Sequence, residues 1–329
     1  MARFQHPTEI VQLPEGLHPA SVEVQRSFWT LTGYASMIER TPQQAHGNFI
    51  DFCKSYVKPD AQWAIQHLHF NNQDDGRALA RAIQNNHSVA AVSDSPKDAY
   101  GTAAWIIQDE RTGSELTGRM IIPGQPKDLD AYRCELGGLY GITVIIDALC
   151  MYHSIKSGSI TKACDGDMAL KHATNEYDWI SPARPHFDLI AAIWSTNART
   201  PLKWESKHVK GHQDDCRTAT LDRWAHLNIR MDTQAKAHSR DTIGDSTRTL
   251  QQKISGEPWA LWIGDRKVVR KLREEVIHHV QGPPCTQYWD EKNRFAPGDS
   301  TAVDWKATAK AMKTVPHSRR IYVTKHSAG

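Results

Sequence analysis

The chain has 329 residues, of which 40% are hydrophobic and 23% are charged, a balance that is typical of a globular protein and excludes whole-chain disorder. Its net charge is +3, and residues 241–329 hold 15 Lys/Arg against 10 Asp/Glu, a surplus of +5 that could help to hold a polyanion through its phosphates. No apolar run approaches the roughly 20 residues that span a bilayer, so we expect no membrane partner.

The N-terminal residues lack the apolar core of a secretory signal, and we therefore expect an intracellular protein, in either the nucleus or the cytoplasm. The six cysteines are scattered, and no two have the C-x-x-C spacing of a zinc knuckle. In a protein that is not exported, we expect these side chains to be reduced thiols.

Three regions follow one another along the chain. Residues 1–86 are predicted to form a mostly helical N-terminal extension, and residues 87–240 alternate strand and helix patterns. Residues 241–329 are predicted to form a basic, partly helical C-terminal extension, with one strong helix over Arg266–His279 and breaks at Gly282-Pro283-Pro284 and beyond.

The middle region has the pattern of a mixed α/β sheet flanked by helices. Three strands joined by short turns precede two strands that are reached through helices, which predicts a five-stranded sheet with three antiparallel and two parallel strands. The predicted strands are Ser88–Ser93, Gly101–Ile107, Leu116–Ile122, Ser159–Cys164 and Leu202–Val209. The predicted helices are Ala131–Tyr152, Asp188–Asn197 and Leu221–His238.

Carboxylates stand at the ends of these elements. Asp94 and Asp165 each follow a strand directly, and ligand sites of open α/β sheets lie beyond the carboxyl ends of their strands. Glu135 lies in the first turns of the long helix, and Asp232 lies four residues after Asn228, on the same helix face. Four converging acids would repel one another unless cations are present, and hard oxygen ligands favour magnesium or manganese.

Each acid alone has an ordinary structural explanation, because an Asp after a strand is commonly a turn former or a helix cap. The ordered set with its local contexts is more specific. The segments Arg133-Cys134-Glu135-Leu136 and Cys164-Asp165-Gly166, together with Asp94 after the first strand, resemble the type 1 ribonuclease H family.

Two further segments extend this resemblance over residues 87–240, about the size of the whole family domain. The run from Trp204 to His212, with Val209-Lys210-Gly211-His212, is similar to the fifth strand and the mobile histidine loop of the family, and Asn228-Ile229-Arg230-Met231-Asp232 is similar to its closing helix. The nearest resemblance is to ribonuclease H domains in reverse-transcriptase open reading frames of eukaryotic retroelements.

The resemblance implies a ribonuclease H-like fold with helical N- and C-terminal extensions. It implies a metal-dependent endonuclease that hydrolyses the RNA strand of RNA–DNA hybrids, with two Mg²⁺ ions, or Mn²⁺ as a substitute, that orient water and stabilise the leaving oxygen. The metal ligands would be Asp94, Glu135, Asp165 and Asp232, and His212 would assist at the leaving group. Other segments of a retroelement polyprotein would be possible partners.

The candidate substrate contacts are Ser95, Lys210 and Asn228. The family usually has glycine where Ser95 stands, and Pro96 after it has no N–H to offer a phosphate or a sugar. This departure favours an alternative, a catalytically silent module that binds hybrid or duplex. A DNA-directed nuclease of the same superfamily is a third reading. Asp167 is an alternative ligand to Asp165, which we prefer because it ends the strand.

Overall fold

The computed structural model describes residues 21–22, 31–32, 47–87, 89–94, 101–124, 128–174, 184–211, 213, 221–242, 253–254, 257, 260–264, 266–293 and 305–319. The chain divides into two compact units, Met1–Asn48 and Phe49–Gly329. In the first unit, strand β1 (Ser21–Val22) pairs antiparallel with strand β2 (Leu31–Thr32).

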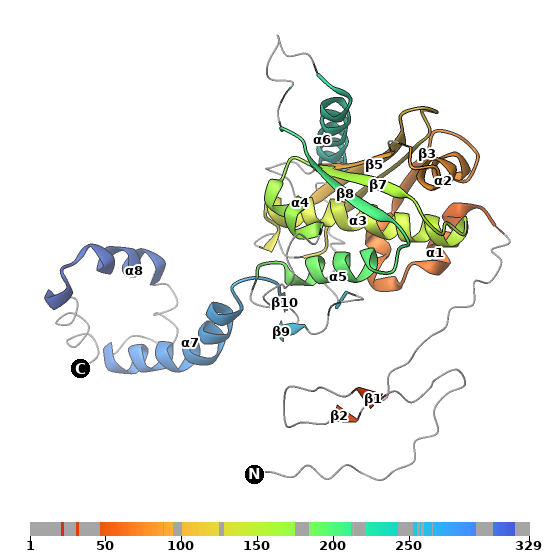
Figure 1. Cartoon of the computed structure of the whole chain (residues 1–329). Helices are drawn as coiled ribbons and strands as arrows, with labels where there is room; N and C mark the ends of the chain where they lie inside the picture. Colours follow the sequence, from red (N-terminus) through yellow and green to blue (C-terminus); the bar gives the residue numbers. More distant parts are fainter. Residues whose placement is uncertain are drawn as a thin grey trace. The chain divides into compact units, whose positions relative to one another are not determined.

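The second unit is built on a six-stranded mixed sheet in the order β3-β6-β5-β4-β7-β8 (Figure 1). The pairs β3–β6, β6–β5 and β5–β4 are antiparallel, and the pairs β4–β7 and β7–β8 are parallel. The strands are β3 (His67–Phe70), β4 (Val89–Asp94), β5 (Thr102–Asp109), β6 (Glu115–Ile121), β7 (Ser159–Cys164) and β8 (Lys203–His208). The order and directions of the last five confirm the predicted ribonuclease H-like sheet, to which β3 adds a sixth strand.

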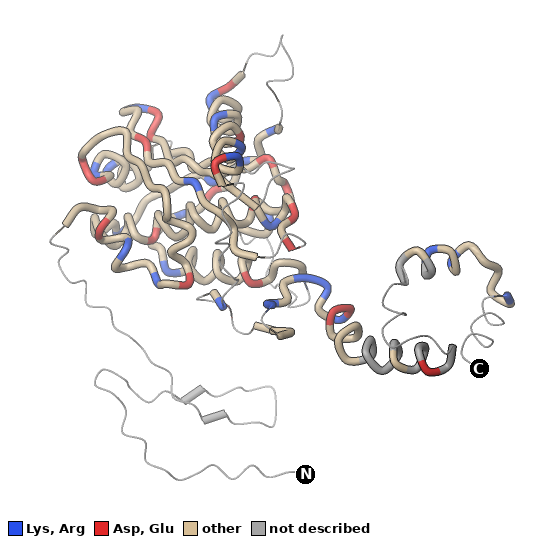
Figure 2. The backbone as a smooth tube through the Cα atoms, turned by 180° about the vertical axis from the view of Figure 1, so that it is seen from behind, with Lys and Arg blue, Asp and Glu red and all other residues tan. Residues whose placement is uncertain are grey.

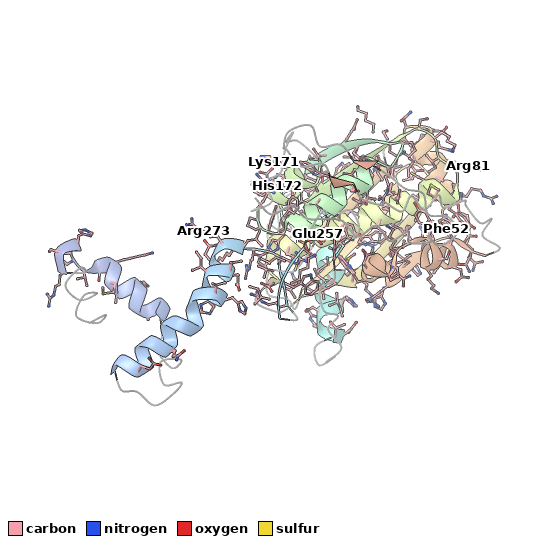
Figure 3. All side chains as sticks on the ribbon, turned by 90° about the horizontal axis from the view of Figure 1, so that it is seen from below. Phe52, Arg81, Lys171, His172, Glu257 and Arg273 are labelled. Carbon is pink, nitrogen blue, oxygen red and sulfur yellow. The ribbon has the colours of Figure 1, made fainter. Side chains whose placement is uncertain are left out.

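The segment before β4 belongs to the same compact unit as the sheet. It holds helix α1 (Phe49–Tyr56), the 3-10 helix η1 (Pro59–Ile65), β3 and helix α2 (Arg77–Gln84). Because β3 pairs with β6, the boundary expected at residue 86 falls inside this unit. Helices α1 and α2 lie at the other end of this unit from helix α4 (Asp167–Ala173), as the labelled residues Phe52, Arg81 and His172 show (Figure 3).

One face of the sheet is covered by helix α3 (Ala131–Tyr152), which has the bounds that the sequence predicts, and by helix α5 (Phe187–Asn197) against it. Helix α3 approaches the sheet closely because glycines face it: a Cβ at Gly138 would lie 2.9 Å from the Cβ of Ser93, and one at Gly141 would lie 2.5 Å from Met120. This helix is buried almost throughout.

Contrary to the expectation from the sequence, α3 is long and apolar enough to cross a membrane by length and hydropathy alone. In its most apolar window, 89% of the residues are buried inside the protein, which is how a central core helix passes the same test. The result is therefore weak grounds for a membrane segment.

The other face of the sheet is covered by helix α6 (Arg223–Thr242), on the opposite side of the sheet from α3 (Figure 1). Met231 and Ala235 of α6 are fully buried in a second apolar cluster, which includes Val92, Ala104 and Ala163 of the sheet. The predicted helix Leu221–His238 is confirmed, with its start two residues later and its end four residues later.

The helix predicted over Arg266–His279 is partly wrong. Residues Arg266–Val268 form strand β10, which pairs antiparallel with strand β9 (Leu261–Ile263), and helix α7 spans Leu272–Asn293, so that Gly282-Pro283-Pro284 does not end it. The start is displaced because Lys267 and Val268 are buried and Lys267 pairs with acids, so tertiary contacts override a local helical pattern. Helix α8 spans Trp305–Thr314.

Acidic and basic residues are interspersed along the described backbone (Figure 2). The four cysteines whose side chains the structure describes are buried thiols: Cys53, Cys134, Cys150 and Cys164. This agrees with the expectation of reduced thiols, and burial raises the pKa of Cys134 to about 12, so that the thiol stays protonated.

Candidate functional site

The strand ends that carry Asp94 and Asp165 are neighbours in the sheet. Strands β4 and β7 run parallel, with Val92 opposite Ala163. Asp94 and Asp165 each follow two residues after this pair, and the two backbones therefore leave the same edge of the sheet side by side, as predicted. The structure describes the backbone of Asp94 but not its side chain.

Glu135 reaches this edge from α3. Its carboxylate lies against Gly166, the residue after Asp165, so closely that a Cβ at Gly166 would overlap it. One turn further along α3, Gly138 packs against Ser93, the residue before Asp94. Glu135 is therefore held between the ends of β4 and β7, in a half-buried position.

Asp165 is covered in turn by the loop that follows β8. A Cβ at Gly211 would lie 2.6 Å from Asp165 Oδ2, and His208 Nε2 lies 3.0 Å from the carbonyl oxygen of Asp165. Asp165 itself is half-buried. The loop of residues 209–211 thus leads from the end of β8 directly over the Asp165 carboxylate.

Asp232 lies on α6, which covers the opposite face of the sheet from α3 and Glu135. One turn after it, the carbonyl of Ala235 accepts a hydrogen bond of 3.1 Å from Thr102 Oγ1. Thr102 lies on β5 just beyond Ala104, which is the partner of Asp94 in the antiparallel ladder. The Asp232 side chain is 20% exposed and forms an ion pair with Lys236, one turn further along α6.

The described side chains do not include a complete cluster. In the ranges given above, no group of three or more His, Cys, Asp or Glu residues lies close enough to hold a metal ion. The alternative ligand Asp167 forms an ion pair of 2.9 Å with Lys171 at the start of α4. Two predicted site residues, Ser95 and His212, lie outside the described residues, as does the Asp94 side chain.

The remaining predicted contacts differ in accessibility. Lys210 is exposed at the start of the loop over Asp165, whereas Asn228 is only 3% exposed and lies on the inner side of α6. Asn228 therefore offers little surface to a substrate in this conformation, and Asp232 is the more accessible of the two.

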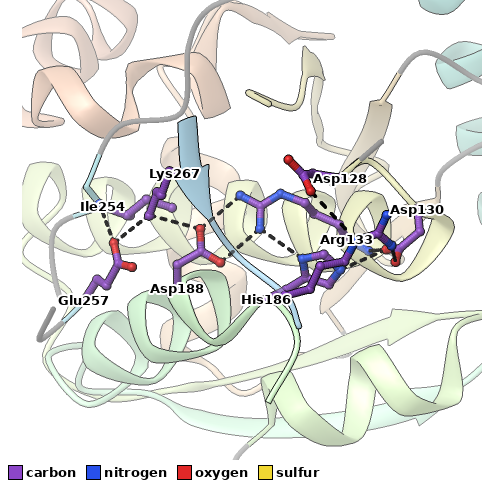
Figure 4. Close-up of polar contacts among 9 residues, drawn as sticks. Asp128, Asp130, Arg133, His186, Asp188, Ile254, Glu257 and Lys267 are labelled. Carbon is purple, nitrogen blue, oxygen red and sulfur yellow. Dashed lines mark hydrogen bonds and ion pairs between the residues drawn. The ribbon is translucent and has the colours of Figure 1, made fainter. Parts of the chain in front are cut away.

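Sequence reasoning missed a buried charge network at the start of α3 (Figure 4). Arg133, two residues before Glu135, donates from Nη1 and Nη2 to the two carboxylate oxygens of Asp188 at 2.9 and 3.0 Å. Both side chains are almost fully buried, and although burial opposes it, the charges of Arg133 and Lys267 hold the pKa of Asp188 well below its usual range. The signal in the sequence is Asp188 in the first turn of the predicted helix Asp188–Asn197, but its partner lies 55 residues away.

His186 and Asp130 extend this network to the N-cap of α3. Asp130 accepts the backbone N–H of Arg133, and its carboxylate lies 3.0 Å from His186 Nε2. Burial lowers the pKa of His186, and Nδ1 of its ring lies 3.3 Å from Nη1 of Arg133. Although burial opposes it, the hydrogen bond from His186 and the charge of Arg270 help to lower the pKa of Asp130 to about 2.

Comparison with known proteins adds the following. No protein-family model matches the chain, and no curated protein gives a significant match. Similar solved structures are the N-terminal RNase H domain of Rv2228c from Mycobacterium tuberculosis, fused to maltose-binding protein (10% identity, 48% of this chain and 100% of that chain, TM-score 0.30), and RNase H1 from Halobacterium salinarum NRC-1 (14%, 46% and 98%, TM-score 0.29).

A third similar structure is LC11-RNase H1 in complex with an RNA/DNA hybrid, with 12% identity over 45% of this chain and 99% of that chain and a TM-score of 0.28. With TM-scores near 0.3, these similarities carry no argument by themselves. The fold assignment therefore rests on the strand order and directions given above.

Proposed function

We propose that this protein is a metal-dependent nuclease that cleaves the RNA strand of RNA–DNA hybrids. The observation that carries the proposal is the register of β4 and β7, which brings Asp94 and Asp165 to one edge of the sheet in the fold that the sequence resemblance predicts. An origin in a retroelement remains a prediction from the sequence resemblance.

The side-chain types of the four predicted ligands fit divalent cations. Carboxylate oxygens are the preferred ligands of Mg²⁺, and two of the described carboxylates lie against glycines: Glu135 beside Gly166, and Asp165 beside Gly211. A side chain at either glycine would fill the space of a carboxylate. The ligands would be Asp94, Glu135, Asp165 and Asp232.

Bound Mg²⁺ would lower the pKa of a water molecule and stabilise the charge that develops on the leaving oxygen. The chain supplies the remaining functions. Helix α3 carries Glu135 to the residue after Asp165, and the 209–211 loop brings Gly211 against the Asp165 carboxylate, so both carboxylates would offer oxygens at the end of β7. Lys210, exposed at the start of that loop, is placed to contact a phosphate, and His212 would give or take a proton at the leaving oxygen.

The test is cleavage of a labelled RNA–DNA hybrid in Mg²⁺ by the wild type, Glu135→Gln, Asp165→Asn and the control Asp167→Asn. We expect the first two changes to reduce cleavage by about 100-fold or more, since ligands count for more than the 10- to 100-fold typical of their supporting partners. We expect Asp167→Asn to stay within a few-fold of the wild type, because Asp167 is already paired with Lys171. Equal cleavage by all four proteins would reject the proposed ligands.

A specific observation favours the second candidate function, a silent module that binds hybrid or duplex. Lys236 forms an ion pair with Asp232, so one proposed ligand already has a cationic partner. The Ser95-Pro96 sequence points the same way. A silent module would bind the hybrid equally with Mg²⁺ or with EDTA and would not cleave it. Cleavage of duplex DNA in preference to the hybrid would instead indicate a DNA-directed nuclease.

A further inference from the structure

The start of α3 is held by a part of the chain far outside the region that resembles a nuclease domain. We define the C-terminal segment as the described residues 253–254, 257, 260–264 and 266–270. Lys267 of this segment is 1% exposed and donates to Asp188 Oδ2 at 3.1 Å and to Glu257 at 2.6 Å. Asp188 thus lies between Lys267 and Arg133 (Figure 4).

The segment is attached at several further points. Val269 accepts a backbone hydrogen bond of 2.6 Å from His186, and Ile254 is buried in the main apolar core. Arg270 forms an ion pair of 2.8 Å with Asp130, the N-cap of α3. Arg266 adds ion pairs with Asp128, just before α3, and with Glu275 of α7.

The charges in the most deeply buried part of this network balance. Two cationic side chains, Arg133 and Lys267, face two carboxylates, Asp188 and Glu257. A buried carboxylate between two buried cations is costly to desolvate, and removing one partner leaves an uncompensated charge. The position of Arg133 therefore depends on Lys267 as well as on Asp188.

Arg133 and the N-cap Asp130 lie in the turn that leads into Glu135. Because a helix is rigid over one turn, the side chains that hold Arg133 and Asp130 also set the position and direction of Glu135. We propose that the C-terminal segment is an integral support of the active site, and that Lys267 is a positioning residue for Glu135, acting through Asp188 and Arg133. This inference rests on the proposed function, since it takes Glu135 as a metal ligand.

The test uses the full-length chain with the double variant Lys267→Met/Glu257→Gln, which removes one positive and one negative charge together. Lys253→Met is the matched control, because Lys253 belongs to the same segment and is exposed. Lys267→Arg is the conservative variant. The first readout is hydrogen exchange of the amides at residues 131–137 without metal, with α6 as internal reference. The second is kcat and KM for hybrid cleavage, each measured over a range of Mg²⁺ concentrations.

We expect the double variant to unfold cooperatively but to exchange about 10-fold faster at residues 131–137, with α6 unchanged. We expect kcat to fall about 10-fold, with KM for the hybrid unchanged and more Mg²⁺ needed for half-maximal rate, as for other residues that orient metal ligands. The conservative variant Lys267→Arg should keep most of the exchange protection and most of the kcat of the wild type. If the double variant does not fold, Glu257→Gln alone is the substitute. It removes one of the two carboxylates that hold Lys267, and we expect the same changes at about 3-fold.

A double variant with the exchange and kcat of Lys253→Met would overturn the inference. So would a loss of kcat that comes with uniformly faster exchange over the whole unit, because that is a general loss of stability. Failure of the proposed function looks different: the wild type would not cleave the hybrid at all, while the local exchange at residues 131–137 would still respond to Lys267.

Discussion

Two clusters of charge flank the first turns of α3, and they differ in burial and in balance. The network around Arg133 and Asp188 is almost fully buried, and its acids and bases are matched. The candidate site around Glu135 and Asp165 is half-buried, and its carboxylates lie against glycines. The same motif, Arg133-Cys134-Glu135, sends one side chain into each cluster. A balanced buried cluster supports the structure, whereas a gathering of acids at a strand edge can bind cations.

This comparison predicts the largest effect on stability at Asp188. Asp188→Asn leaves Arg133 and Lys267 buried with one negative charge fewer between them, and loss of one partner of a buried pair costs about 3–5 kcal/mol. Urea denaturation followed by circular dichroism measures the loss. Asp241→Asn is the control, because its pair with Arg119 is long, at 4.0 Å, and exposed, and we expect it to change stability by less than about 0.5 kcal/mol. Equal effects of the two changes would show that the buried network does not stabilise the fold.

The next effect concerns the candidate site. Gly166→Ala would push the Glu135 carboxylate away from Asp165, and we expect cleavage to fall about 10-fold, which corresponds to about 1.4 kcal/mol. Stability should change by less than about 1 kcal/mol, because the Glu135 side chain can rotate to another staggered position. Gly138→Ala should do the reverse, since its Cβ would press on Ser93 in the core and lower the free energy of unfolding. Cleavage kinetics and denaturation, measured for both variants, distinguish an effect on the candidate site from an effect on the stability of the fold.

A smaller effect should appear at acid pH, at the N-cap residue Asp130. The pKa of Asp130 is lowered in the folded protein to about 2, so its charge stabilises the fold above the unfolded value of about 3.9, and this contribution is lost as pH falls from about 4 to about 2. Asp130→Asn keeps a residue that can cap α3. It should therefore cost roughly 1 kcal/mol at pH 7, allowing for its 41% exposure, and less at pH 2.5. A difference that stays constant with pH would mean that the Asp130 charge has no role.

The two clusters also differ in how far they can be read from the sequence. The strand ends carrying Asp94 and Asp165 follow from local patterns, and the bounds of α3 and β7 agree with prediction because their apolar periodicity and their flanking turns are local. The buried network joins residues that lie 55 and 79 positions apart, Arg133 with Asp188 and Lys267 with Asp188. No local pattern predicts such distant pairs. From the sequence alone, the Lys- and Arg-rich stretch that begins at Arg266 therefore resembles the start of a helix, whereas its burial against Asp188 makes it a strand.

Strand β3, at the edge of the sheet beside β6, is a second element that the sequence does not predict. His67–Phe70 alternates between polar and apolar residues, but over only four positions, which is too short a run to predict a strand before its pairing with β6 is known. For the candidate site, the sequence predicts the residue types but not their arrangement in space. The order of acids along the chain predicts which side chains to test, whereas the supporting contacts of Gly166 and Gly211 appear only in three dimensions.

The smallest effect sharpens the difference between paired and gathered acids. Lys236 and Asp232 form an i,i+4 ion pair on α6, and Lys171 and Asp167 form a similar pair on α4. If Asp232 is a metal ligand, Lys236 competes with the cation, and a partly exposed pair of this kind is worth about 0.2–1 kcal/mol. Lys236→Gln should therefore lower the Mg²⁺ concentration for half-maximal cleavage by about 2- to 5-fold, while Lys171→Gln should leave it unchanged. A Mg²⁺ dependence that neither change alters would show that Asp232 is not a metal ligand and that its pair with Lys236 is structural.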